Sequence, residues 1–149
     1  MSFQNQFTKT TTDANLMETV HHGSAEYPFR YYYENIALFD FKCIDWHWHS
    51  ELEFIYIESG NVVFDIGTVH FELNEGNGIM INSKILHRLQ SSSDAIIPNF
   101  LFQPSFIAPQ DSLIYKKYIS PVISSSLEYL VFQPDIPWQK KALEIIKTI

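Results

Sequence analysis

The sequence is poor in basic residues and in cysteine. Only 10 Lys and Arg residues stand against 17 Asp and Glu, which gives the 149-residue chain a formal net charge of −7. Because binding to a phosphate backbone needs clustered basic side chains, this balance argues against DNA binding by these residues themselves. Cys43 is the single cysteine, so the chain cannot form an internal disulfide, which is typical of a protein in a reducing compartment.

Long apolar runs are also absent from the sequence. No stretch approaches the length of a membrane-spanning helix, because Glu, Asp or Gly soon interrupts each apolar segment. The first residues, Met-Ser-Phe-Gln-Asn-Gln, have neither the basic nor the apolar block of a secretion signal. We therefore expect a cytoplasmic protein that does not enter a membrane.

Strand-forming residues dominate the middle of the chain. Aromatic residues make up 15% of the sequence, and short apolar segments alternate with turn residues such as Ser59-Gly60-Asn61. Seven or eight short antiparallel strands at this spacing are typical of a small barrel or a double-sheet jelly roll. The expected strands of this run are 52–58, 62–66, 69–73, 79–81, 86–90 and 96–102.

Three segments can be distinguished along the chain. Residues 1–26 are polar and rich in threonine, so we expect a flexible N-terminal arm in which His21 and His22 are solvated. Residues 27–133 form the expected barrel domain, with a short helix near 111–120 that Asp111 caps and Pro121 ends. Within this domain an alternation predicts an additional early strand, one face of which carries Ala37, Phe39, Phe41 and Cys43.

Residues 134–149 have the pattern of an amphipathic helix. Asp135 is the expected cap and Pro137 lies in the first turn. Because the apolar stripe still continues at the last residue, without a Gly, Asn or basic cap, we expect the natural protein to continue beyond this sequence. The stripe could pack on its own barrel or contact a second copy, and it consists of Trp138, Ala142, Ile145 and Ile149.

The stretch HWHSELEFIYIESG combines strand-forming residues with imidazoles and carboxylates. In an extended strand alternate side chains share a face, so His47, His49, Glu51 and Glu53 would all project to one side. In a closed barrel that side is the interior, where His87, at the start of a later strand, adds a third imidazole. Such a donor set could hold Zn, Fe, Mn or Ni. The alternative is that the same groups form hydrogen bonds to one another or to an organic ligand.

This spacing resembles that of a known superfamily. The intervals between His47, His49, Glu53 and Gly60 reproduce the first motif of the cupins. The second cupin motif is half kept: Gly76 and His87 are in place, whereas Asn82, Lys84 and Ser91 stand where the motif has Pro, Gly and Asn.

A narrower family is similar over a longer stretch. The run DWHWHSELEFIYIESGNVVFDIGTVHFELNEGNGIMINSKILHRL resembles the amino-terminal cupin domain of AraC/XylS-type transcriptional regulators, and the flanks extend the resemblance to about residues 20–149. The resemblance implies a mainly β cupin jelly-roll barrel with C-terminal α-helices. It also implies a small-molecule effector such as a sugar, a homodimer, and DNA binding only through a C-terminal domain that this sequence does not contain.

From this resemblance we expect an effector-binding and dimerisation domain rather than an enzyme. No cofactor is required for that function, although a divalent metal is compatible with the site. The alternative is a metal-dependent cupin enzyme, an oxygenase or isomerase; a sugar-binding module without a regulatory role is a third hypothesis. The expected pocket and potential metal ligands are His47, His49, Glu53 and His87, and the expected dimer contacts are Trp138, Ala142, Ile145 and Ile149.

Overall fold

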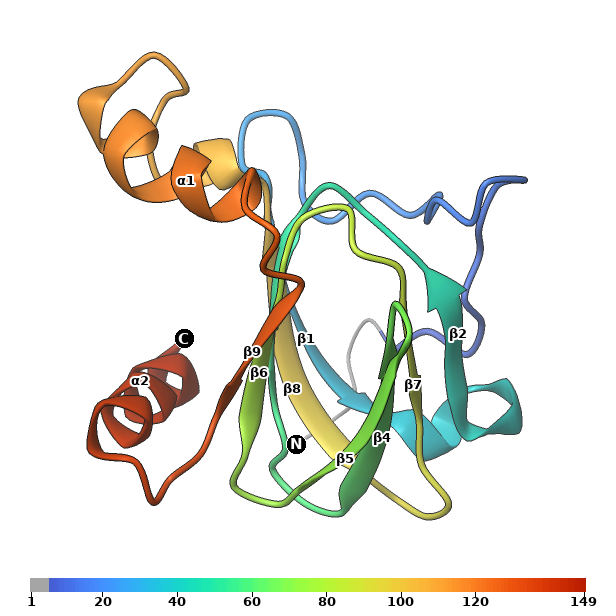
Figure 1. The fold of residues 1–149 in the computed structure, drawn as a ribbon. Coiled ribbons are helices and arrows are strands. Elements are labelled where there is room, and N and C mark those ends of the chain that lie inside the picture. Colours follow the sequence, from blue (N-terminus) through green and yellow to red (C-terminus); the bar gives the residue numbers. More distant parts are fainter. Residues whose placement is uncertain (1–5) are drawn as a thin grey trace.

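The computed structural model describes residues 6–149 and consists mainly of two antiparallel β-sheets that face each other (Figure 1). One sheet has the strand order β1-β8-β3-β6-β9 and the other the order β2-β7-β4-β5. The chain passes back and forth between the sheets, which makes a double-sheet jelly roll and confirms the predicted mainly β fold. The strands are β1 (Phe29–Asn35), β2 (Cys43–His47), β3 (Leu52–Tyr56), β4 (Asn61–Ile66), β5 (Val69–Asn74), β6 (Gly78–Ile81), β7 (His87–Gln90), β8 (Ile96–Phe102) and β9 (Tyr129–Phe132).

The space between the sheets is filled by aliphatic side chains and Phe64. On β3, for example, Ile55 points inward and is fully buried, while Leu52 and Phe54 point to the opposite face of the sheet. The turn after β3 depends on Gly60, which has φ of 83° and lies so close to the backbone of Asp94 that an added Cβ would be 2.4 Å from its carbonyl oxygen. The glycine of the first motif is therefore required for a backbone approach and a left-handed conformation that other residues rarely adopt.

The outer face of the five-stranded sheet is covered by helices. Helix α2 (Pro137–Thr148) lies beside β9 and buries Leu143 against this face (Figure 1). Its N-cap is Ile136, without a side-chain cap, so the prediction that Asp135 caps the helix is wrong. Pro137 occupies the first turn as predicted, where its missing N–H is not needed.

The second helical region lies between β8 and β9. A turn at Pro104–Phe106 precedes a π-helix at Tyr115–Ile119, which continues directly into α1 (Ser120–Ile123). The prediction that Pro121 ends this helix is wrong, because the proline lies in the first turn of α1 instead.

The early strand predicted from alternating apolar residues is also wrong for most of its length. After β1 the chain forms two 3-10 turns, Ile36–Leu38 and Asp40–Lys42, before β2 begins. The side chain of Asn35 accepts a hydrogen bond from the N–H of Ala37 and so starts the first turn. Phe41 consequently does not share a buried face: it has φ of 59° and is 99% exposed.

Residues 6–24 lie along the open side of the barrel, between the edge strands β1 and β2. The Gln6 side chain accepts a hydrogen bond from the N–H of Asn35, and the Thr10 hydroxyl accepts one from the N–H of Asp45. We call residues 6–24 the N-terminal segment. The predicted arm also includes residues 1–5, which lie outside the described residues, and its flexibility stays a prediction. Within residues 6–149, no helix combines the length and the apolar character that a membrane span requires.

Candidate functional site

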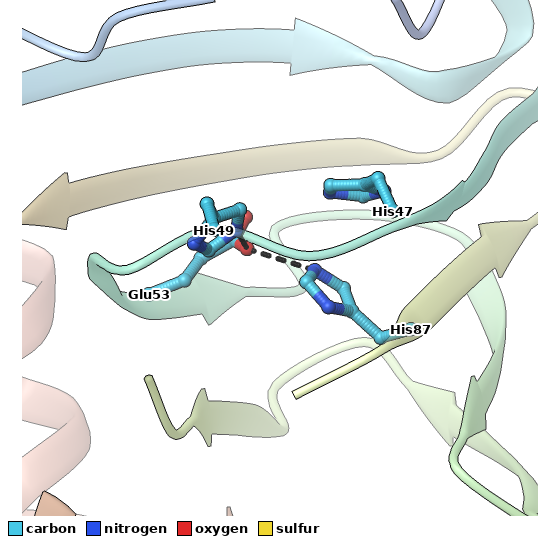
Figure 2. A group of neighbouring side chains, drawn as sticks. All are labelled: His47, His49, Glu53 and His87. Carbon is cyan, nitrogen blue, oxygen red and sulfur yellow. Dashed lines mark hydrogen bonds and ion pairs between the residues drawn. The ribbon is translucent and has the colours of Figure 1, made fainter. Parts of the chain in front are cut away.

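The four residues expected to form the pocket come from three strands and one connection and meet between the sheets (Figure 2). His47 is the last residue of β2, His49 lies in the following connection, and Glu53 is on β3. His87 is the first residue of β7. One ligand atom from each of the four lies within 4.8 Å of all the others, and all four side chains are buried.

The strand geometry predicted for the stretch from His47 to Glu53 is partly wrong. The prediction assumed one continuous strand through His47 and Glu53, whereas β2 ends at His47 and β3 begins at Leu52, in the other sheet. The chain bends at Ser50 and crosses between the sheets, so the residues converge because the barrel brings the two strands face to face. Glu51, which the same alternation placed on the same face, accepts hydrogen bonds from Ser50 and Gln103 through Oε1, and its Oε2 is 4.0 Å from Nε2 of His22.

The connection after β6 helps to position His49. Lys84, which stands where the second cupin motif has glycine, has φ of 64°, the left-handed conformation that glycine adopts most easily. Its backbone N–H donates a 2.7 Å hydrogen bond to the carbonyl of His49. The backbone geometry expected of the motif glycine is therefore present although the residue differs.

Backbone carbonyls determine which nitrogen of each ring faces the cluster. The Nδ1–H of His47 donates to the carbonyl of Asp45 and that of His87 to the carbonyl of Ile85, both at 2.7 Å. The corresponding bond of His49 goes to the carbonyl of Glu51 at 3.1 Å. Because a carbonyl can only accept, each Nδ1 carries a proton and each Nε2 is left to face the cluster.

The Nε2 atoms converge on carboxylate oxygens. Oε2 of Glu53 is 3.1 Å from Nε2 of His49 and 3.2 Å from Nε2 of His87 (Figure 2). The ring centroids of His47 and His87 are 4.2 Å apart. A neutral ring with its proton on Nδ1 presents a lone pair at Nε2, so each Nε2–carboxylate contact is favourable only with a proton or a cation between the two atoms.

Burial and neighbouring charges distribute the protons in this cluster. Burial acts to lower the pKa of His49, but the hydrogen bond and negative charge of Glu53 outweigh it and raise this pKa above its ordinary value. Burial acts to raise the pKa of Glu53, yet its bonds to His49 and His87 hold it well below the usual range. Burial and the nearby His87 lower the pKa of His47 to about 3, so its ring is neutral near pH 7.

The donor set also fits a divalent transition metal. Three imidazole nitrogens and one carboxylate are the mixed nitrogen and oxygen ligands that Zn, Fe, Mn and Ni accept, whereas Ca²⁺ and Mg²⁺ prefer oxygen ligands alone. A histidine that binds a metal usually donates its other ring N–H to a second group. Each of the three rings has such a group here, because its Nδ1–H donates to a backbone carbonyl. A bound ion would supply positive charge and a Lewis acid at the place where the Nε2 atoms converge on Glu53.

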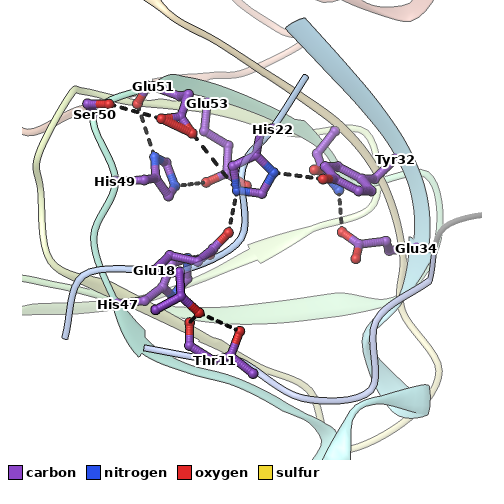
Figure 3. Close-up of polar contacts among 12 residues, drawn as sticks. Thr11, Glu18, His22, Tyr32, Glu34, His47, His49, Ser50, Glu51 and Glu53 are labelled. Carbon is purple, nitrogen blue, oxygen red and sulfur yellow. Dashed lines mark hydrogen bonds and ion pairs between the residues drawn. The ribbon is translucent and has the colours of Figure 1, made fainter. Parts of the chain in front are cut away.

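Two residues of the N-terminal segment lie beside the cluster, although the motif did not indicate them. Glu18 contacts His22 through Oε1, and its Oε2 is 3.4 Å from Nε2 of His47 (Figure 3). His22 is 9% exposed, so the prediction that it is solvated is wrong. Neither residue belongs to a strand or to the cupin motifs, so the spacing of the motifs did not connect them with His47.

Strands β1 and β8 contribute further polar groups. Tyr32 and Glu34 alternate on β1 and both point inward, and the side-chain amide of Asn99 on β8 donates a 2.9 Å hydrogen bond to Glu34. Burial is the main cause that raises the pKa of Glu34 to about 7, and the bond from Asn99 opposes the shift. These groups, three members of the cluster (His47, His49 and Glu53) and the N-terminal segment line a cavity of about 50 Å³.

Comparison with known proteins agrees with the resemblance seen in the sequence. Residues 39–109 match the family described as the AraC-like ligand binding domain. This segment therefore belongs to the AraC-like ligand binding domain family. It includes β2, β3 and β7 and with them all four residues of the cluster.

A curated relative matches over most of the chain. The uncharacterized HTH-type transcriptional regulator YdeC of Bacillus subtilis (strain 168) is 32% identical over 140 residues, which are 92% of this chain and 47% of YdeC. The chain thus spans about half the length of this relative.

Solved structures with some likeness include two cupin proteins. A cupin 2 conserved barrel domain protein from Salinispora arenicola has a TM-score of 0.45 and 12% identity, with 60% of this chain and 71% of that chain covered. A cupin-2 domain containing protein from Shewanella frigidimarina has a TM-score of 0.44 and 14% identity, with 49% and 69% covered.

Proposed function

We propose that this chain is the effector-binding and dimerisation part of a cytoplasmic AraC-type transcription regulator. The observation that carries the proposal is that the segment matching the ligand-binding family is the one that builds the buried cluster of His47, His49, Glu53 and His87. A small molecule, with neutral sugars as one class, binds there and favours one of two arrangements of the regulator. No catalytic cofactor is needed, and a further domain binds DNA, in keeping with the acidic charge of this chain.

The size of the cavity adds a requirement for organic effectors. About 50 Å³ holds one or two water-sized groups, whereas pockets for organic ligands usually measure roughly 300 to 1,000 Å³. A sugar can therefore enter only if the N-terminal segment moves away from the open side. Ligand binding and the position of this segment are coupled for that steric reason.

Thermal unfolding with a defined ligand panel tests the pocket. The chain is heated with each of several neutral monosaccharides and with Zn²⁺, Mn²⁺, Co²⁺ or Ni²⁺. A ligand at about 100 times its Kd stabilises the folded state by about 2.7 kcal/mol, which raises the Tm of a domain of this size by roughly 5–10 °C. We expect such a shift for at least one ligand, its loss in His49→Ala and Glu53→Ala, and its retention in His70→Ala, which changes an exposed side chain. An equal rise in Tm for all variants would show that the cluster is not part of the ligand site.

We also propose that α2 forms the contact between two copies. Trp138 is 57% exposed and Ile145 and Ile149 are each 56% exposed, while Ala142 is half-buried and completes the stripe. These residues lie beside the face of α2 that packs on the sheet, so a second copy would extend an existing apolar surface. Light scattering is expected to show a dimer that Ile145→Lys dissociates and that Glu144→Lys, on the other side of α2, leaves intact. A monomer before any substitution would contradict the proposal.

A further inference from the structure

Glu18 approaches the cluster from outside the family motif. It belongs to the N-terminal segment, 29 positions before His47 in the numbering, and its side chain, which is 11% exposed, lies beside that ring (Figure 3). Its Oε2 lies 3.4 Å from Nε2 of His47. Because Nδ1–H of His47 is donated to the carbonyl of Asp45, a lone pair of the ring faces a carboxylate oxygen. This contact repels unless a positive charge lies between the two atoms.

A chain of hydrogen bonds orients the Glu18 carboxylate. The hydroxyl of Tyr32 donates to Nδ1 of His22 at 2.7 Å, and Nε2–H of His22 donates to Oε1 of Glu18 (Figure 3). One carboxylate oxygen is therefore held by His22, and the other remains directed at His47. Orientation of a ligating carboxylate by a second hydrogen-bonded group is the usual arrangement around protein metal sites.

The backbone links Glu18 to the two histidines of the first motif. Trp48 lies between His47 and His49, and its N–H donates to the carbonyl of Leu16 at 3.0 Å. The N–H of Glu18 donates in return to the carbonyl of Trp48 at 2.9 Å. The N-terminal segment and the two rings thus share one backbone ladder, so a bond that holds Glu18 in the cluster also holds this segment on the barrel.

Size and charge indicate which ligand this closed arrangement accepts. The cavity of about 50 Å³ has room for an ion and is far smaller than the pockets that hold organic effectors. Glu53 and Glu18 together bring two negative charges to three imidazoles, so a divalent ion would make the buried site neutral. Nitrogen donors exclude Ca²⁺ and Mg²⁺ as the preferred ions.

We propose that Glu18 is a fifth ligand of a divalent transition-metal ion held by His47, His49, Glu53 and His87, and that binding of this ion fastens the N-terminal segment onto the barrel. The inference rests on the proposed function, because it assigns a ligand class to the same pocket. Glu18 binds the ion, and His22 is a positioning residue that orients Glu18. Whether the site holds an ion therefore determines the position of the N-terminal segment at the protein surface.

Metal affinity of matched glutamate variants tests the role of Glu18. Zn²⁺ binding is measured by competition with a chromogenic chelator for the unchanged chain, for Glu18→Gln and for the control Glu51→Gln. Glu51 is also buried near His49, but its Oε1 accepts hydrogen bonds from Ser50 and Gln103, and its Oε2 is 4.0 Å from Nε2 of His22 rather than facing His47. We expect Glu18→Gln to weaken Zn²⁺ binding about 10-fold or more and Glu51→Gln to leave it within about 3-fold. The visible spectrum of bound Co²⁺ should also change in Glu18→Gln, because it depends on the number of ligands.

Amide hydrogen exchange tests the fastening of the segment. Zn²⁺ should slow exchange of residues 12–19 in the unchanged chain and in Glu51→Gln, but not in Glu18→Gln, with circular dichroism confirming that each variant is folded. Equal Zn²⁺ affinity and equal slowing in Glu18→Gln would overturn the inference. Absence of Zn²⁺ and Co²⁺ binding to the unchanged chain would overturn it as well. Either result leaves the pocket itself to be judged by the monosaccharide panel and the His49→Ala and Glu53→Ala variants.

Discussion

The inward faces of the same strands line two very different regions, an apolar interior and a polar open side. On β3, Ile55 is fully buried among aliphatic side chains, whereas Glu53, two residues earlier, meets three imidazoles. On β7, Leu89 belongs to the apolar interior and His87 to the cluster. An inward-facing position therefore does not by itself define a core residue. The apolar interior stabilises the fold by burying hydrocarbon. Burial of polar groups on the open side lowers that stability unless each group has a hydrogen-bond or ionic partner.

The largest expected effect concerns the apolar region. Phe64 on β4 is fully buried between the sheets, so Phe64→Ala removes a large side chain and leaves a cavity. We expect the free energy of unfolding to fall by about 3–5 kcal/mol in urea denaturation. Val69→Ala, at a side chain that is 41% exposed, is the control and should change the free energy by less than about 1 kcal/mol. A loss as small as that of the control would mean that the interior does not hold the fold.

The next effect concerns Glu34, a buried acid on the polar side. Its folded-state pKa of about 7 lies above the ordinary value of 4.5, so the folded chain holds a proton that the unfolded chain releases between these two values. Stability is therefore fully present below about pH 4.5 and is lost as the pH rises through about 7. Glu34→Gln keeps the oxygen that accepts from Asn99 and removes this loss.

Urea denaturation across pH 4 to 9 checks the Glu34 prediction. Relative to the unchanged chain, Glu34→Gln should gain stability as the pH rises, reaching roughly 3 kcal/mol above pH 8. Glu72→Gln, at an exposed position on β5, should follow the unchanged chain at every pH. Parallel curves for all three proteins would show that the acid is not held protonated.

The smallest effect concerns the contact between the N-terminal segment and β1. Tyr32→Phe removes the hydroxyl that bonds His22 and should lower the free energy of unfolding by about 1 kcal/mol. Because the two groups act together, His22→Ala added to Tyr32→Phe should cost less than the sum of the single changes. Tyr31→Phe, on the other face of β1, is the control. Strict additivity would indicate that the N-terminal segment is not held by this bond.

The fold could be inferred from the sequence because its signals are local. Short apolar runs separated by turn residues predicted the strands, and the position of Gly60 agrees with its left-handed φ of 83°. Alternation failed at Phe41, because a side-chain bond from Asn35 started a 3-10 turn that the apolar pattern does not encode. The prediction for Pro121 failed for a different reason, because proline is compatible with the first turn of a helix as well as with the residues that follow a helix end.

The candidate site was predicted only in part. The motif spacing named His47, His49, Glu53 and His87, and these four side chains do meet. Strand alternation alone placed Glu51 on the same face as Glu53, and the bend between β2 and β3 breaks that alternation. Their role as ligands stays a prediction.

The sequence by itself determined the mainly β architecture, the acidic charge and the identity of the four clustered side chains, because strand period, composition and the spacing of a family motif are all recorded in the order of residues along the chain. Only the tertiary structure decided that Glu18 and His22 join them and that the remaining cavity is ion-sized. The physical reason is that packing two sheets and a covering segment brings together groups from distant parts of the chain. No pattern of neighbouring residues indicates which of these distant groups come into contact.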